Sequence, residues 1–169
     1  MLVEEIFELV KWLAHTNAER AVAIATPLDD RFVLGVAVGF LVGQEEGMEP
    51  GFYLLDGKKE SWASVSSGQF MARSTSICLD QAWLVNAGAH FLFLANLEVL
   101  DKTWGPRGYR YAMLTAGRLG QRLYVAAEAM GMGCCGIGAL YDSEAMDMLG
   151  LNESSRLLYL VAVGNVKRV

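Results

Sequence analysis

The residues best suited to chemistry stand together in one short run, Gly131-Met132-Gly133-Cys134-Cys135-Gly136. Its glycines have the G-x-G-x-x-G spacing of dinucleotide-binding loops, in which a strand precedes the loop and a helix follows it, so that the helix N-terminus holds the pyrophosphate. Here the order is reversed, because a long apolar helical pattern comes first and a short strand pattern follows. The run therefore predicts a helix end and not a dinucleotide loop.

Two interpretations of the glycines remain open. Gly136 and Gly138 can serve the close packing of a buried strand, since a residue without a Cβ lets a neighbouring element approach. They can equally let a planar ligand approach the backbone, where amides on the free side of a strand are able to bond it. The sequence alone does not choose between the two.

Other reactive side chains form no catalytic or metal-binding pattern. Adjacent cysteines such as Cys134 and Cys135 rarely bond to each other, and cysteine is often simply buried. A metal would need further ligands, whereas His15 and His90 stand in unrelated segments. His90 lies inside a strand pattern and is expected to be a hydrogen-bonded core or boundary residue. Ser66-Ser67-Gly68 lacks the strand-turn-helix context of a hydrolase nucleophile.

Two arginines stand just before the longest helical pattern. Arg107 and Arg110 flank Gly108-Tyr109, and a helix N-terminus favours bound anions. The alternative is that both arginines make ordinary contacts with carboxylates or carbonyls. Both interpretations stay open.

The elements that would position these residues follow from hydrophobic periodicity. Helices are predicted over Val3–His15, Ser74–Val85, Tyr109–Met130 and a segment capped by Ser143 that ends at Leu149. Strands are predicted over Arg31–Val42, Phe52–Leu55, Glu60–Val65, Ala89–Ala95, Cys134–Leu140 and Leu157–Val163, with a hairpin turn at Asp56-Gly57. Long helices with a modest sheet indicate an α+β fold. Tyr109–Met130 is apolar on nearly all sides, so it is expected to be central or in an interface.

Bulk composition excludes several classes of protein. The 169 residues are 53% hydrophobic with a net charge of −5, which predicts one globular domain over residues 1–169 and no nucleic-acid partner. The acidic start has no basic region or cleavage site, and no apolar run reaches about 18 residues, so neither a signal peptide nor a membrane span is expected. An odd cysteine count fits a reducing, cytoplasmic setting.

An ordered set of phrases resembles the nitroreductase-like FMN oxidoreductase superfamily, and within it the SagB-type branch associated with azoline-oxidising dehydrogenases. The matching phrases cover about three quarters of the chain; they are GMEPGFYLLD (Gly47–Asp56), CLDQAWLVNAGAHFLFLANLE (Cys78–Glu98), RGYRYAMLTAG (Arg107–Gly117), Q-x-LYVAA (Gln121–Ala127), GMG (Gly131–Gly133), IGALYD (Ile137–Asp142), LGL (Leu149–Leu151) and LYLVAVG (Leu158–Gly164). Each phrase alone is weak, but their order and spacing are fairly specific.

The resemblance implies a three-layer α+β sandwich that dimerises through the long helix, with FMN at the dimer interface and NAD(P)H as hydride donor to a small organic acceptor. By position, the backbone of Gly136, Ile137, Gly138 and Ala139 falls beside the flavin, with Gly138 and Ala139 facing its N5 atom. Gln81 matches the side chain that contacts the pyrimidine edge. No catalytic acid or base is identified.

The chain also departs from the family pattern. The arginine- and serine-rich segment that grips the FMN phosphate has no counterpart before Val3, so the chain is expected to be shortened at its N-terminus. Arg20, Lys167 and Arg168 are the candidate substitutes, since a buried phosphate needs cationic partners. Three functions therefore remain: an FMN-dependent oxidoreductase, a flavin-free relative acting as a binding module or partner subunit, and a binder of another small ligand.

Overall fold

The structure, a computed structural model, describes residues 3–23, 35–45, 47–56 and 61–166, without the side chains of residues 14–23. Its helices are α1 (Val3–Ala23), α3 (Met71–Ile77), α4 (Leu97–Trp104), α5 (Gly108–Ala129) and α6 (Asp142–Leu149), with short 3-10 turns η1 (Ala82–Asn86) and η2 (Gly105–Arg107). Its strands are β1 (Ala37–Val42), β2 (Gly51–Asp56), β3 (Ser61–Ser67), β4 (Ala89–Asn96), β5 (Met132–Ile137) and β6 (Ser155–Asn165).

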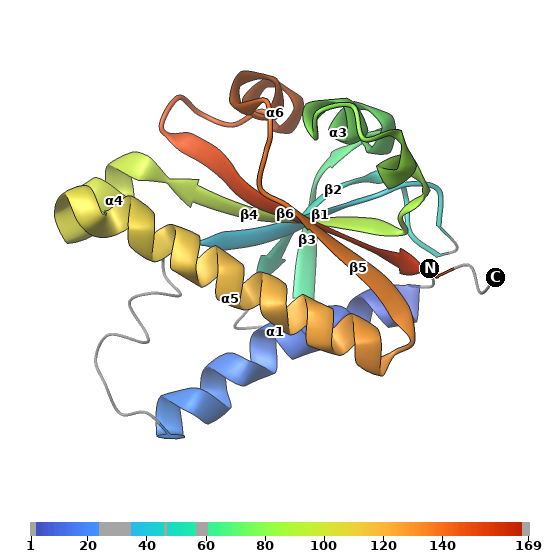
Figure 1. The fold of residues 1–169 in the computed structure, drawn as a ribbon, viewed down its shortest axis with the longest axis horizontal. Coiled ribbons are helices and arrows are strands. Elements are labelled where there is room, and N and C mark those ends of the chain that lie inside the picture. The colour runs from blue at the N-terminus through green and yellow to red at the C-terminus, as the bar shows by residue number, and fades with distance from the viewer. Residues whose placement is uncertain (1–2, 24–34, 46, 57–60, 167–169) are drawn as a thin grey trace.

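The strands form one antiparallel sheet in the order β3-β2-β1-β4-β6-β5. Helices α1 and α5 cover one face of this sheet, and α3 and α6 cover the other (Figure 1). The predicted α+β sandwich with helices on both faces is confirmed. The antiparallel pairing of the predicted hairpin is confirmed, since β2 and β3 pair from Asp56↔Ser61 onward. Asp56 belongs to β2 and not to the turn, and Gly57 lies outside the described residues.

Strand β4 shows why its sequence is apolar without interruption. Ala89, Phe91 and Phe93 pack into the cluster beneath α1 and α5, whereas Leu92 and Leu94 pack into the cluster beneath α3 and α6. Successive side chains of a strand point to opposite faces, so a strand covered on both faces needs apolar residues at nearly every position. His90 occupies the second face and is the polar exception.

The helix predicted over Ser74–Val85 is wrong as one continuous element. Helix α3 ends at Ile77 and η1 begins only at Ala82. Between them, Leu79 and Asp80 have φ values of +58° and +56°, a region that side-chain-bearing residues rarely occupy. Tertiary contacts must hold this turn, which is why local periodicity did not reveal it.

Helix α4 was not predicted from the sequence. Helix α4 follows β4 directly, and the Asn96 side chain accepts a hydrogen bond of 3.0 Å from the Val99 amide, as an N-cap should. Leu100 is buried, while Leu97 and Trp104 pack at the edge of the core. The capping residue and the apolar spacing were both visible in the sequence.

Several boundaries also differ from the sequence prediction, and α1 continues to Ala23, beyond the predicted end at His15. Ser143 lies inside α6 and does not cap it, because the helix starts at Asp142 and Tyr141 holds the capping position. Strand β5 ends at Ile137, which leaves Gly138–Leu140 without regular structure. Strand β1 begins at Ala37, and residues 31–34 lie outside the described part of the chain.

Helix α5 has two different faces. The face on the sheet is made of small and aliphatic residues: Ala112, Ala116, Leu119, Leu123, Ala126 and Ala127. Four large apolar residues of α5 remain exposed, Tyr109, Met113, Leu114 and Val125, with Leu114 at 63% exposure, alongside exposed polar residues such as Arg110 and Gln121. The helix therefore is not enclosed by its own sheet. It stops where predicted, since Gly131 has φ of +71° after the C-cap Met130.

Two tyrosines pack around Gly136 on β5. The Tyr124 hydroxyl of α5 accepts a hydrogen bond from the Gly136 amide. A Cβ added at Gly136 would overlap the Tyr159 hydroxyl of β6. Glycine is therefore required here for the packing of α5 on the sheet, which favours the packing interpretation at this position.

Among the described residues, no helix combines the length and the apolar character that crossing a membrane requires.

We expect Gly136→Ala to lower the free energy of unfolding by about 1–3 kcal/mol, because the new methyl group must displace the Tyr159 ring. Gly138→Ala is the matched control two residues away. A Cβ there meets no atom within 4 Å, so the change should stay within about 0.5 kcal/mol. Urea unfolding of both variants measures the difference, and equal stability of the two would contradict this account of Gly136.

Candidate functional site

The residues expected at the cofactor lie on two neighbouring segments of the described chain. Gln81 stands in the turn between α3 and η1, while Gly138 and Ala139 follow β5. The Tyr141 amide donates a hydrogen bond of 3.0 Å to the carbonyl oxygen of Ile77, the last residue of α3. This bond joins the segment after β5 to the turn that carries Gln81, on the face of the sheet covered by α3 and α6 (Figure 1).

The half-buried Gln81 side chain is oriented by its own turn. Its Nε2 atom donates a hydrogen bond of 2.9 Å to the Cys78 carbonyl oxygen. Within the described part of the chain no hydrogen bond reaches Gln81 Oε1, so this atom can accept a bond from a ligand N–H. Leu79 and Asp80 supply the left-handed backbone that places Gln81 at the start of η1.

The four backbone positions from Gly136 to Ala139 play different structural parts. The Gly136 amide is bonded to Tyr124 Oη, and the Ile137 side chain is buried under α6. Gly138 and Ala139 are exposed, and a Cβ added at Gly138 would meet open space. The backbone that a flat ligand can approach is therefore at Gly138 and Ala139, while Gly136 is committed to packing.

The two adjacent cysteines point to opposite faces of the sheet. Cys134 packs with the cluster beneath α5, whereas Cys135 packs with the cluster on the opposite face. Both are free thiols, and burial together with the neighbouring Cys135 raises the pKa of Cys134 to about 12. At neutral pH the Cys134 thiol is therefore protonated and a poor nucleophile. No group of His, Cys, Asp and Glu able to hold a metal occurs in the described ranges.

His90 is a fully buried, doubly hydrogen-bonded core residue, as predicted. Its Nδ1 atom lies 2.9 Å from Ser74 Oγ, and its Nε2 atom lies 3.0 Å from the Leu84 carbonyl oxygen. Since a carbonyl only accepts, Nε2 must carry the proton and Ser74 Oγ must donate to Nδ1. Desolvation lowers the pKa of His90, so the neutral ring persists at pH 7.

The structure does not describe the side chains that are expected to bind the FMN phosphate. Arg20 lies on α1 without a described side chain, and Lys167 and Arg168 lie outside the described residues. Arg107 and Arg110 are exposed at the N-terminus of α5. Their role as an anion site stays a prediction.

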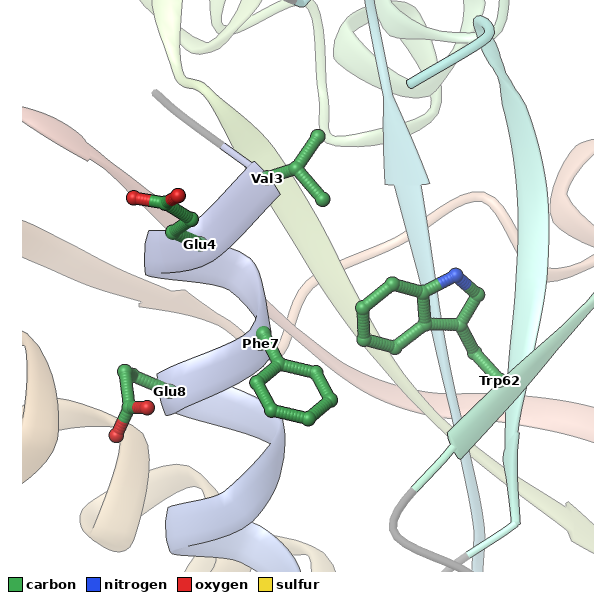
Figure 2. A pocket seen from close by; sticks show the side chains of 5 residues that line it. All are labelled: Val3, Glu4, Phe7, Glu8 and Trp62. Atoms are coloured by element: carbon green, nitrogen blue, oxygen red, sulfur yellow. The ribbon is translucent and has the colours of Figure 1, made fainter. Parts of the chain in front are cut away.

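A groove of about 470 Å³ lies between α1 and β3, on the face of the sheet opposite Gln81. Val3 and Phe7 of α1 point toward Trp62 of β3 across the groove, while Glu4 and Glu8 lie on the side of α1 away from Trp62 (Figure 2). Phe7 and Trp62 meet edge to face with ring centroids 5.7 Å apart.

The chain itself supplies a cation to this groove, which sequence reasoning missed. Lys11 Nζ lies 4.5 Å from the centroid of the Phe7 ring and 2.9 Å from Glu8 Oε1. The spacing of these residues, three and four apart on a helix, was the signal that could have revealed the pairing. Lys11 thus contacts one aromatic and one acidic residue of the groove.

Comparison with known proteins identifies the family and the fold. Residues 41–165 match the model of the nitroreductase family. A protein of Methanocaldococcus jannaschii assigned as a nitroreductase is 28% identical over 112 residues, which are 66% of this chain and 57% of that protein. The crystal structure of an assigned nitroreductase from Anabaena variabilis superposes with a TM-score of 0.74 at 27% identity, covering 79% of this chain and 27% of that one.

A third comparison concerns the fold alone. An assigned nitroreductase from Ralstonia eutropha has a TM-score of 0.77 at 14% identity, over 100% of this chain and 75% of its own. The present chain thus spans little more than half of the archaeal relative and about a quarter of the cyanobacterial one. With its central 125 residues matched to one family model, and with the antiparallel sandwich of that fold, the chain belongs to the nitroreductase family.

Proposed function

We propose that the protein is an FMN-dependent oxidoreductase that works as a homodimer, taking hydride from NAD(P)H and passing it to a small organic acceptor. The observation that carries the proposal is the open backbone at Gly138 and Ala139, joined through the Ile77–Tyr141 hydrogen bond to the turn of Gln81. A flat heterocycle with polar edges suits this combination of backbone amides and one side-chain amide.

The described residues fit the isoalloxazine part of FMN. Gln81 Oε1 is available to a ring N–H at the pyrimidine edge, and Gly138 leaves space where any side chain would stand. When bound, FMN supplies the hydride chemistry, whereas the chain's part is to bind, orient and exclude water. Arg20, Lys167 and Arg168 are the candidate partners of the phosphate.

The exposed apolar side chains of α5 support the homodimer. Tyr109, Met113, Leu114 and Val125 remain exposed on a helix whose sheet-facing side is packed, and Leu114 and Val125 point away from the sheet. Large exposed apolar side chains next to polar ones are common in protein interfaces. A second copy of the chain would bury them and close the cofactor site.

Two finer assignments belong to the same proposal. The phrases around Gln81, α5 and β6 favour the SagB-type branch, whose members oxidise azolines, as the relatives of this chain. Three free cysteines favour a reducing, cytoplasmic setting.

We expect the purified protein to be yellow, or to bind added FMN, with quenching of flavin fluorescence as the measurement. Gly138→Leu should weaken FMN binding by at least about tenfold, because the leucine side chain would fill the space beside the ring. A tenfold rise in the dissociation constant corresponds to a loss of about 1.4 kcal/mol of binding free energy. Its unfolding midpoint should match that of Gly138→Ala, since no protein atom is nearby. Full flavin occupancy in Gly138→Leu would exclude this placement. A colourless protein that ignores FMN would instead favour a flavin-free binding module.

We expect Leu114→Glu to convert the dimer to a monomer, because it places a charge on the most exposed apolar side chain of α5. Sedimentation velocity measures the oligomeric state. Val65→Glu on β3 is the matched control, since Val65 is a similarly exposed apolar residue, at 49%, away from α5. A wild-type protein that is monomeric at micromolar concentration would contradict the dimer.

A further inference from the structure

His90 links the two arms that flank the Gln81 turn. The turn runs from Cys78 to Gln81, with α3 before it and η1 after it. His90 Nδ1 accepts a hydrogen bond from Ser74 on α3, and His90 Nε2 donates one to Leu84 on η1. One buried imidazole of the central strand β4 therefore holds both arms.

The turn has a backbone conformation that its surroundings must stabilise. Leu79 and Asp80 both adopt the left-handed region, and such residues cost on the order of 1–3 kcal/mol each unless the surroundings stabilise them. Within the turn, the Cys78 amide bonds the Ser74 and Thr75 carbonyl oxygens at 3.2 Å, the Asp80 amide bonds Ser76 at 3.2 Å, and the Gln81 side chain bonds Cys78. Cys78 and Leu84 are also packed in the core. Among the hydrogen bonds of the described residues, only those of His90 connect α3 and η1 through one side chain.

Packing alone does not account for a histidine at this position. Its neighbours on the same face of β4, Leu92 and Leu94, are aliphatic, and an apolar residue would fill the space without the cost of desolvating a ring. Both ring nitrogens of His90 are bonded, so the cost is offset by two directional contacts. The neutral ring has one donor and one acceptor, which is the pair that Ser74 and Leu84 require.

We propose that His90 is a positioning residue, which fixes the separation of α3 and η1 and thereby presents Gln81 Oε1 to the bound ligand. The role of His90 in presenting Gln81 to a ligand rests on the FMN site proposed above. The restraint that His90 places on the turn can be measured without any ligand. The bond from Tyr141 to Ile77 extends the same restraint to the segment that begins at Gly138.

Three variants test the restraint in the ligand-free protein. His90→Phe keeps an aromatic ring but loses both bonds, whereas His90→Gln and His90→Asn keep one acceptor and one donor. Leu92→Val, on the same face of the same strand, is the control for general loss of stability. Hydrogen exchange of the Asp80 and Leu84 amides is compared with exchange of the β6 amides, which report global unfolding.

In His90→Phe, exchange at Asp80 and Leu84 should rise by at least about tenfold relative to β6, the effect of roughly one hydrogen bond. Leu92→Val should change the exchange rates of the turn amides and of the β6 amides by the same factor. At least one of His90→Gln and His90→Asn should return exchange in the turn to the wild-type level. If His90→Phe does not fold, Ser74→Ala removes the α3 bond alone and should raise exchange at Asp80 more than in β6. Turn exchange that follows β6 in every variant, or rescue by neither amide, would overturn the proposal.

FMN titration then tests whether the turn that His90 restrains contributes to FMN binding. His90→Phe should raise the FMN dissociation constant by at least about tenfold relative to Leu92→Val, and the rescuing amide variant should return it to within about threefold of wild type. A loosened turn with unchanged FMN affinity would overturn the positioning role. A wild-type protein that binds no FMN would refute the proposed function, while the exchange measurements would still decide whether His90 holds the turn.

Discussion

Burial of β4 and β6 on both faces is the constraint from which the rest of the structure follows. Phe91, Phe93, Leu160 and Val161 have no exposed surface, and each such side chain contributes about 1.5–3 kcal/mol when fully buried. Neither strand can achieve this unless each face of the sheet has its own helical layer. Helices α1 and α5 provide one layer and α3 and α6 the other, and the candidate site lies where the second layer meets the end of β5.

The edge strand β5 connects packing with the site. Edge strands leave unpaired amides that the protein has to satisfy or protect. At Gly136 the amide is satisfied by the Tyr124 hydroxyl, and the space of the missing side chain is filled by Tyr159. Beyond Ile137 both restraints end, so Gly138 and Ala139 are the first positions of this segment whose backbone is open to a ligand. Gly136 and Gly138, on either side of Ile137, thus differ in role: Gly136 allows close packing, and Gly138 leaves the backbone open.

The arrangement of α5 links this segment to assembly. Its small residues allow close approach to the sheet, and its outer face keeps large apolar residues exposed. The same element therefore supports the backbone beside the candidate site through Tyr124 and carries the exposed apolar side chains on which the proposed dimer rests.

The sequence by itself determined the parts that rest on local periodicity. The continuous apolar runs of β4 and β6, the length of α5 and its stop at Gly131 were all predicted close to their observed bounds, because burial on a strand or helix repeats every two or 3.6 residues. Gln81 and Gly138 were named as site residues from a resemblance, since no local pattern marks either one.

Only the tertiary structure decided how those elements meet. It split the predicted helix at Leu79 and Asp80, where contacts through His90 stabilise a backbone that local propensity disfavours. It also assigned Gly136 to packing and Gly138 to open space. These outcomes depend on side chains such as Ser74, Tyr124 and Tyr159 that are distant in sequence, and a one-dimensional pattern carries no information about which distant groups will be neighbours.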